Sequence, residues 1–459
     1  MNNNNNNNNI LRIIVLITTC WSFTGCKKFL DAKPDQKLVV PSTIQDLQGI
    51  LDSYLRVNQY EPSASEVSSD NYYLTDADWS GLAREVYRRM YIWKENNLFE
   101  AGTGEWSYCY DNVFRANTVL ENIDKITVGT NEKELLDNLK GQALALRARS
   151  FLKVAGIWSL AYDEESADTD LGIPLRLNSD FNLPSIRSTL RETYGRIITD
   201  LKDAIPLLSN TQVHVLRTSK AAAYALLART YLSMRKYDEA FLYADSCLRL
   251  HDILLDYNTL NTAATYPIKQ FNSEVILSTR MLTPSYMSNT RAKVDSILYG
   301  SYDADDLRKV AFFKSNNNGT YGFKGSYEGS ASLFDGITTA EILLIRSECY
   351  ARLGKVELAL SDLNHLMLNR WNNKKTFVRF ETDSQKEALE VILSERRKEL
   401  LMRGLRWMDI KRLNKEGAGI TLQREVNGQI YTIPPGDQRF ALPIPEDIIA
   451  LTGMPQNPR

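Results

Sequence analysis

The sequence predicts a protein dominated by α-helices, in which a helical-repeat scaffold carries a loop-rich, irregular lobe. Apolar residues recur at helical spacing over most of the chain, and small residues recur at fixed intervals within several helical segments. Two long segments have no helical period and are rich in Tyr, Trp, Ser, Asn, Asp and Gly. A chain of 459 residues is also long for one compact core, which favours two lobes or a repeat array.

The N-terminus is typical of a lipoprotein signal peptide over residues 1–25. Residues 13–25 are apolar or small, and this run is too short for a membrane-spanning helix, which needs about 20 residues. Because the small Gly25 precedes Cys26, we expect this cysteine to become the new N-terminus and to carry diacylglycerol and an acyl chain such as palmitate. Residues 26–42, with two prolines, would form a tether. An ordinary secretory signal with an incidental cysteine is the alternative.

Small residues in two helical segments follow the spacing of tetratricopeptide repeats. Ala228 and Ala240 lie twelve residues apart, and Ser347 and Ala359 repeat this interval. Small side chains at such positions let two antiparallel helices approach closely, while larger neighbours fill the groove beside them. Segment 138–158 has a similar spacing of small residues. The scaffold is therefore predicted to be tetratricopeptide-like.

These patterns divide the chain into a folded domain over residues 43–459 and the segments that precede it. Helical repeats are expected at about 106–250 and 338–413. The irregular stretches at about 60–105 and 256–337 are expected to face a ligand, because binding residues concentrate on loops that a rigid scaffold positions.

Charge and motif content favour a binding protein over an enzyme. The 55 Lys and Arg nearly balance the 56 Asp and Glu, so no basic excess indicates a nucleic-acid partner. His214, His251 and His365 do not stand at metal-ligand spacing, and the chain has no GxSxG or GxxxxGK[ST] motif. Carboxylates are plentiful enough for a glycosidase pair, but nothing in the sequence marks one. We therefore expect neither catalysis nor a metal or redox cofactor.

Two acidic segments resemble calcium loops in part. In residues 76–87, Asp76 and Asp78 stand at the first and third positions of such a loop, but Tyr87 stands where a bidentate Glu is needed. Residues 163–172 contain five acidic side chains. We interpret the first segment as a turn and the second as a solvated loop, with calcium binding as the alternative for each.

Aromatic and polar residues in the irregular stretches form the predicted ligand site. A flat aromatic ring can stack on the apolar face of a sugar, while Asp or Asn at its edge meets the hydroxyl groups. Segment 68–80 offers both kinds of residue, and segments 283–289 and 316–330 offer further tyrosines. Core packing is the alternative for each of these rings. The predicted ligand-binding residues are Asp70, Asn71, Tyr72, Tyr73, Trp79, Tyr286, Tyr321 and Tyr327.

Four stretches of the chain together resemble a known family. In chain order they are CKKFLDAKP (26–34), WSYCYDNVFRANTVLENID (106–124), ILSERRKELLMRGLRWMDIKRL (392–413) and ALPIPEDIIALTGMPQNPR (441–459). They extend over nearly the whole mature chain and resemble the SusD/RagB family of outer-membrane nutrient-binding lipoproteins.

The third of these stretches is specific, but we interpret it as structural. Glu399 and Arg403 are four residues apart and would pair on one helix face. Gly404 would end that helix, and Trp407 would pack in the core. A network that orients the last helices is the prediction, with ligand contact as the alternative.

The resemblance implies a fold and a function. It implies a tetratricopeptide-like scaffold with a ligand-facing lobe, on the outer face of a SusC-like TonB-dependent transporter barrel that receives a nutrient. The chain would be a non-enzymatic, outward-facing outer-membrane lipoprotein that binds a glycan, with the Tyr321–Tyr327 loop as an alternative transporter contact. An oligopeptide ligand, as in the RagB-like branch, is the first alternative. A scaffold that binds only protein and a surface glycosidase are the others.

Overall fold

The structure is a computed structural model that describes residues 41–102, 104–127 and 129–459. The predicted signal peptide, the predicted lipidation site Cys26 and nearly all of the predicted tether lie outside these residues. Residues from Thr43 to Arg459 form one compact unit, and the fold below is that of this unit. Within the described part of the chain, no helix is both long and apolar enough to cross a membrane.

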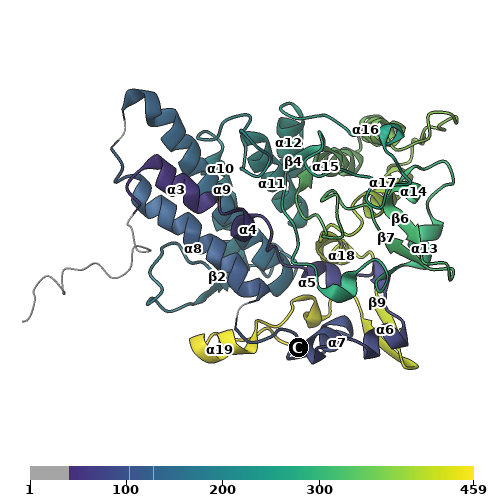
Figure 1. Ribbon diagram of the computed structural model, residues 1–459, viewed down its shortest axis with the longest axis horizontal. Coiled ribbons are helices and arrows are strands. Elements are labelled where there is room, and N and C mark those ends of the chain that lie inside the picture. Colours follow the sequence, from purple (N-terminus) through teal and green to yellow (C-terminus); the bar gives the residue numbers. More distant parts are fainter. Residues whose placement is uncertain (1–40, 103, 128) are drawn as a thin grey trace, which may run out of the picture. The chain divides into compact units, whose positions relative to one another are not determined.

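A row of helices forms the scaffold, and each helix packs on the next (Figure 1). The row continues from α12 to α15 although the second irregular stretch separates these helices in the sequence. This helix-dominated architecture confirms the predicted fold class. The helices of the row are α8 (Glu105–Ile123), α9 (Lys133–Trp158), α10 (Leu190–Ala204), α11 (Lys220–Ser233), α12 (Tyr237–Leu248), α15 (Thr339–Arg352), α16 (Val356–Leu368) and α17 (Gln385–Glu399).

Small side chains allow the helices of this row to approach closely. Gly141 of α9 faces α10, and a Cβ atom at this position would lie 2.8 Å from Cγ of Leu208. The hydroxyl of Ser347 donates a hydrogen bond of 2.7 Å to the carbonyl oxygen of Ala359. The four small residues singled out by their spacing, Ala228, Ala240, Ser347 and Ala359, are all fully buried.

A small antiparallel sheet joins the two irregular stretches in the lobe. Its strand order is β1 (Tyr72–Tyr73), β5 (Lys293–Val294), β7 (Tyr321–Phe323) and β6 (Phe313–Ser315). Gly322 lies in the middle, where a Cβ atom would stand 1.7 Å from the carbonyl oxygen of Asn289, so a side chain does not fit. The short helices of the lobe are α5 (Ala64–Val67), α6 (Asp76–Ser80), α7 (Glu85–Tyr91), α13 (Ser296–Gly300) and α14 (Arg308–Phe312).

In the part of the domain that the structure describes, three two-stranded sheets and four further helices complete the fold. The β9–β10 hairpin turns at Asn427-Gly428, where both residues have positive φ, as tight hairpin turns require. The strand pairs are β2 (Leu171–Pro174) with β3 (Arg187–Thr189), β4 (Val275–Leu277) with β8 (Ile337–Thr338), and β9 (Leu422–Val426) with β10 (Gln429–Ile433). The helices are α3 (Ile44–Leu51), α4 (Tyr54–Val57), α18 (Arg406–Asn414) and α19 (Glu446–Thr452), and 3₁₀ turns lie at Thr130–Glu132, Tyr257–Thr259, Ser285–Met287 and Gln438–Phe440.

Buried ion pairs connect the end of α17 to the lobe. Glu399 is fully buried and pairs with Arg370 at 2.8 Å and with Arg308 at 3.3 Å. Burial by itself raises the pKa of Glu399, but these two guanidinium groups outweigh it and lower the pKa below its ordinary value. The stretch is therefore structural, as predicted. The predicted Glu399–Arg403 pair is wrong, because α17 ends at Glu399 and Arg403 lies over the Tyr327 ring, 3.9 Å from its centroid.

The two acidic segments make ion pairs. Residues 76–80 form α6 rather than a turn, and Asp78 pairs with Lys293. In the second segment, Asp163 pairs with Lys415 at 2.9 Å, and Glu164 pairs with two cationic side chains. Among the residues that the structure describes, no group of three or more His, Cys, Asp or Glu side chains is placed to hold a metal ion.

Candidate functional site

Four of the predicted ligand-binding residues lie in the core. Asn71, Tyr72, Tyr286 and Tyr327 are almost completely buried. Tyr72, for example, donates its hydroxyl hydrogen to the carbonyl oxygen of Val67 at 2.9 Å, and β5 pairs with its strand. We expected Asn71 and the three tyrosine rings to face a ligand. The structure corrects that expectation, because all four side chains are buried and only Tyr286 reaches the wall of a pocket.

Asp70 is used in an ion pair between the lobe and α18. Its two carboxylate oxygens accept hydrogen bonds of 2.7 and 2.8 Å from Arg406, and Arg397 approaches to 3.2 Å. Burial by itself raises the pKa of Asp70, but Arg406 and then Arg397 lower it below its ordinary value. This carboxylate is therefore already engaged within the protein.

The other three predicted residues are partly exposed but lie apart from the cavities. The indole N–H of Trp79 donates to the carbonyl oxygen of Arg88 at 3.2 Å. Tyr321 stacks on Tyr299 with ring centroids 3.6 Å apart, and Tyr73 belongs to β1. Of the eight predicted residues, only Tyr286 lines either of the two pockets described below, so the structure does not bring the set together around one cavity.

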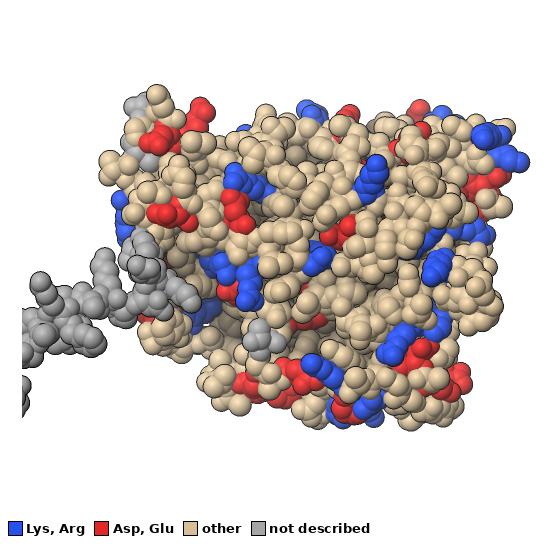
Figure 2. Space-filling view, in the orientation of Figure 1, with Lys and Arg blue, Asp and Glu red and all other residues tan. Residues whose placement is uncertain are grey.

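A pocket of about 400 Å³ lies between α7, α8 and α19. Residues of both irregular stretches contribute to its walls. We call it the lobe pocket, and Figure 2 shows a hollow on this face between α8 and the strip that contains α7 and α19. Charges of both signs are scattered over the same face. The lining residues that matter below are Arg84, Tyr87, Phe99, Glu100, Trp106 and Ser285.

The loop at the mouth of the lobe pocket is fixed by two acidic residues of α19. The backbone N–H of Asn97 donates to Glu446 at 2.5 Å, and that of Gly102 donates to Asp447 at 2.6 Å. These charge-assisted hydrogen bonds are stronger than neutral ones. They position Phe99 and Glu100 against the pocket.

The lobe pocket combines aromatic surface with polar groups that a ligand can reach. The half-buried ring of Tyr87 packs on Tyr286, with centroids 4.9 Å apart. Arg84 and Glu100 approach to 3.7 Å, but their side chains are 57% and 49% exposed, so this ion pair contributes little to stability. The hydroxyl of Ser285 is exposed and has no hydrogen-bond partner among the described residues.

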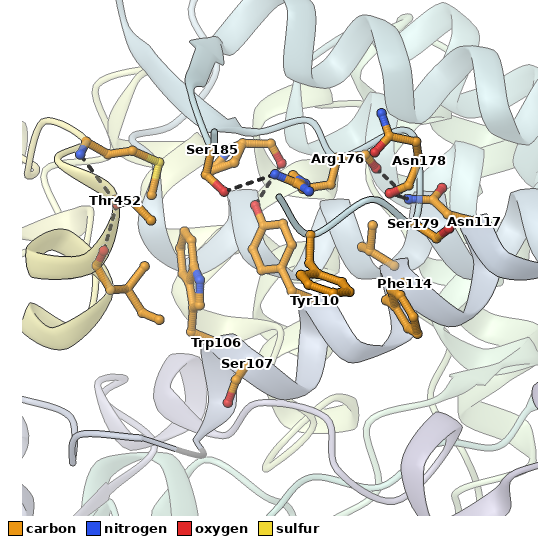
Figure 3. A pocket seen from close by; sticks show the side chains of 15 residues that line it. Trp106, Ser107, Tyr110, Phe114, Asn117, Arg176, Asn178, Ser179, Ser185 and Thr452 are labelled. Atoms are coloured by element: carbon orange, nitrogen blue, oxygen red, sulfur yellow. Dashed lines mark hydrogen bonds between the residues drawn. The ribbon is translucent and has the colours of Figure 1, made fainter. Parts of the chain in front are cut away.

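A second pocket, of about 300 Å³, adjoins the first along α8 (Figure 3). We call it the helix pocket. Trp106, Tyr110 and Phe114 follow one another at four-residue intervals, which places them on one face of α8. Trp106, Ser107 and Ile448 line both pockets. The two pockets therefore form one cleft with Trp106 at their junction.

Trp106 carries an unpaired hydrogen-bond donor at this junction. Its side chain packs against Tyr110 and Trp158, with ring centroids 5.0 and 5.2 Å away, and the residue is only 5% exposed. Its indole N–H has no acceptor among the described residues. Unlike the indole N–H of the neighbouring Trp158, which is buried and unpaired, the indole N–H of Trp106 keeps contact with the solvent. It is therefore free to donate a hydrogen bond to an acceptor oxygen of a ligand.

The sequence reasoning missed the residues that line the cleft. It assigned residues 106–124 to the scaffold, although Trp106, Tyr110 and Phe114 stand at helical spacing and one of them is 46% exposed. The signal for a site was this aromatic row on a single helix face. Arg84 and Tyr87 had a weaker signal, because Arg84 is the residue before a short helix and Tyr87 lies in its first turn.

The row of helices and the cleft on its lobe define a helical-repeat binding protein. Residues 28–232 match a family described as "Starch-binding associating with outer membrane", and residues 309–458 match the "SusD family". The chain belongs to the SusD/RagB family.

Curated and solved relatives agree with this assignment. A SusD-like protein P38 of Formosa agariphila is 24% identical over 487 residues, which cover 83% of this chain and 91% of the relative. A putative sugar binding protein of Bacteroides vulgatus has a TM-score of 0.74 at 22% identity and covers 92% of this chain and 99% of its own. A SusD superfamily protein of Bacteroides thetaiotaomicron has a TM-score of 0.72 at 22% identity, with coverages of 91% and 100%. These solved structures share the fold of this chain.

Proposed function

We propose that this protein is a non-enzymatic surface lipoprotein that binds a glycan in the lobe pocket, without a metal or redox cofactor. The observation that carries the proposal is the composition of that pocket. The ring of Tyr87 offers a stacking surface, while Arg84, Glu100 and Ser285 offer polar groups at its rim. Such a combination matches the apolar face and the hydroxyl edge of a sugar ring. The family description and the sugar-binding relative support the same ligand class.

Calorimetry tests the ligand class directly. Soluble protein that begins at Lys27 would be titrated with a panel of polysaccharides, oligosaccharides and mixed oligopeptides. We expect saturable heat with a glycan and none with the peptides. Heat with peptides alone would contradict the proposal and favour an oligopeptide-binding, RagB-like function. Turnover of a glycan during the titration, detected as new reducing ends, would contradict the non-enzymatic part.

We also propose that Cys26 carries the lipid anchor and that the protein delivers its ligand to a SusC-like TonB-dependent transporter in the outer membrane. The small residue before Cys26 and the family description support this location. Cells fed radioactive palmitate should label the wild-type chain and not the Cys26→Ala variant. Affinity purification from solubilised outer membranes should recover a large barrel protein with the wild-type chain. A labelled Cys26→Ala protein would contradict the anchor, and recovery without any barrel would contradict the partner.

A further inference from the structure

The helix pocket differs from the lobe pocket in having few polar groups left for a ligand. The side chain of Asn117 is fully used, because its amide donates to the carbonyl oxygens of Arg176 and Asn178 and its oxygen accepts from Arg147. The hydroxyl of Thr452 donates to a carbonyl of its own helix. Ser107 and Ser179 are likewise engaged within the protein.

A bare sugar is therefore a poor occupant of the helix pocket. Few of the hydroxyls that enter it would find a free partner in exchange for their water, which costs free energy. Apart from the exposed Asn178 and the half-buried Ser185, most of the remaining walls are apolar or aromatic, and they include Val113, Pro174 and Met454. An apolar group loses nothing on entering such a surface and gains from its removal from water.

Two exposed phenylalanines stand at this pocket. Phe114 of α8 is 46% exposed, and Phe181 of the loop between β2 and β3 is 84% exposed. The loop is held closed by Arg176, whose guanidinium donates to the carbonyl oxygens of Leu183, at 2.5 Å, and Asp180. Phe181 is thus presented by an ordered loop, and a planar ring of a ligand has aromatic surface to pack against.

The unpaired polar group on the side of the lobe pocket is the indole N–H of Trp106. It has no acceptor among the described residues and stands at the junction of the two pockets, whereas Asn178 and Ser185, whose donors are also unused among the described residues, lie on the loop between β2 and β3. Figure 3 shows its ring beside that of Tyr110, whose own hydroxyl is already used as a donor to Pro174 at 2.9 Å. The complete occupant is therefore an apolar, planar body with one acceptor oxygen on the side of the lobe pocket.

We propose that the helix pocket binds an aromatic acyl group that is ester-linked to the glycan in the lobe pocket. The ring lies among Tyr110, Phe114 and Phe181, and the ester carbonyl oxygen accepts the hydrogen bond from the indole N–H of Trp106. The glycan carrier rests on the proposed function, whereas the recognition of an aromatic ester rests on the helix pocket alone. The protein thereby selects esterified over unsubstituted glycans.

Methyl benzoate is a probe for this pocket that contains no sugar. Soluble protein from Lys27 onward, with ¹⁵N-labelled tryptophan, gives one indole N–H resonance per tryptophan, and the Trp106→Phe variant identifies the resonance of Trp106. We expect methyl benzoate to shift that resonance saturably. In the Phe114→Ser variant we expect at least a tenfold loss of affinity. The matched control is Ile297→Ser, because Ile297 is 80% exposed in α13 and lines neither pocket.

Each outcome of this titration either supports or overturns the aromatic-ester subsite. The proposal is supported if methyl benzoate shifts the Trp106 resonance, and if Phe114→Ser weakens this binding while Ile297→Ser does not. No shift of Trp106, or a shift that Phe114→Ser leaves unchanged, overturns it. N-acetylphenylalaninamide is titrated in parallel, and binding of this peptide analogue without binding of methyl benzoate overturns the ester in favour of a peptide side chain. Because Phe114 is half exposed, Phe114→Ser should fold, and an unchanged melting temperature verifies this.

A matched pair of carbohydrates tests the carrier. Feruloylated arabinoxylan oligosaccharides are compared by calorimetry with the same oligosaccharides after saponification. We expect the esterified form to bind at least tenfold more tightly, and Phe114→Ser to abolish the difference. Equal affinities overturn the proposal. Methyl benzoate binding in a protein that binds no carbohydrate of the larger panel would contradict the proposed function while leaving the aromatic-ester subsite in place.

Discussion

The buried charge network around Glu399 and the cleft around Trp106 use polar groups in opposite ways. At Glu399 both partners are arginines, all three side chains are fully buried, and every charge is paired. At the cleft, Arg84 and Glu100 are about half exposed, and the indole N–H of Trp106 has no acceptor among the described residues. The most distinctive sequence motif thus contributes a fully paired carboxylate to the core, whereas the groups that we propose for binding are exposed or reach the solvent.

The largest expected effect comes from disrupting the buried charge network around Glu399. Glu399→Ala leaves Arg308 and Arg370 buried without their shared carboxylate, which should lower the free energy of unfolding by about 3–5 kcal/mol. Urea titration followed by circular dichroism measures it. The matched control is Glu390→Ala on the same helix, where the pair with Lys386 is long and exposed, and we expect a change below about 0.5 kcal/mol. Equal effects of the two variants would contradict the claim that the buried ion pairs of Glu399 stabilise the fold.

Acid should weaken a second buried ion-pair cluster, that of Asp409 with Arg396 and Arg412, in a defined pH window. Burial by itself raises the pKa of Asp409, but Arg396 and Arg412, at 2.9 and 2.8 Å, lower it to about 2. Since the folded-state pKa lies below the ordinary 3.8, the stabilisation is present above about pH 4 and is lost as the pH falls toward 2. It amounts to about 2 kcal/mol. Urea midpoints at pH 6, 4 and 3 measure it, and Asp409→Asn should flatten this dependence. A slope unaffected by that change would contradict the assignment.

A variant of Tyr72 tests whether this residue belongs to the core or to the binding site. Tyr72→Phe keeps the buried ring and removes the hydroxyl that donates to Val67, so we expect a loss of about 1 kcal/mol in unfolding free energy and no change in glycan affinity. Denaturant titration and calorimetry on the same preparation measure both quantities. A weakened affinity with unchanged stability would return Tyr72 to the binding site.

The Arg84→Ala variant should give the smallest effect, and it should change glycan affinity rather than stability. Because its ion pair with Glu100 is exposed, Arg84→Ala should leave stability within about 0.5 kcal/mol of the wild type. Loss of a polar contact at the pocket rim should weaken glycan binding about threefold, or about 0.7 kcal/mol. Calorimetry with the best glycan of the panel tests this. If stability falls and affinity does not, Arg84 belongs with the structural charges.

The fold could be predicted because it depends on local periodicity. The helical spacing of apolar residues and the twelve-residue interval of small ones each identify an element from neighbouring positions alone. The buried positions of Ala240 and Ser347 follow from that pattern. The structural interpretation of residues 392–413 was also confirmed. The partners of Glu399 could not be predicted, because Arg308 and Arg370 are distant from it in the sequence.

The site could not be predicted in the same way because exposure is a property of tertiary packing. Tyr72 and Tyr87 both look like loop aromatics in the sequence, but a neighbouring strand covers the first and a pocket opens beside the second. Composition alone does not distinguish them. The row of Trp106, Tyr110 and Phe114 was visible in the sequence, but a helix in a repeat scaffold usually buries such a row. Only the tertiary structure, in which α19 and the loop after β2 line the same pocket as α8, shows that the row borders a cleft.

One measurement tests most directly the claim that ligand binding belongs to the cleft and not to the aromatics predicted from the sequence. Tyr87→Ala and Tyr321→Ala each remove a partly exposed tyrosine, the first inside the lobe pocket and the second outside both pockets. Calorimetry with the glycan that binds the wild-type protein compares them. We predict about a tenfold loss of affinity for Tyr87→Ala, or about 1.4 kcal/mol, and no change for Tyr321→Ala. The reverse result would contradict this prediction and place the site on the small sheet of the lobe.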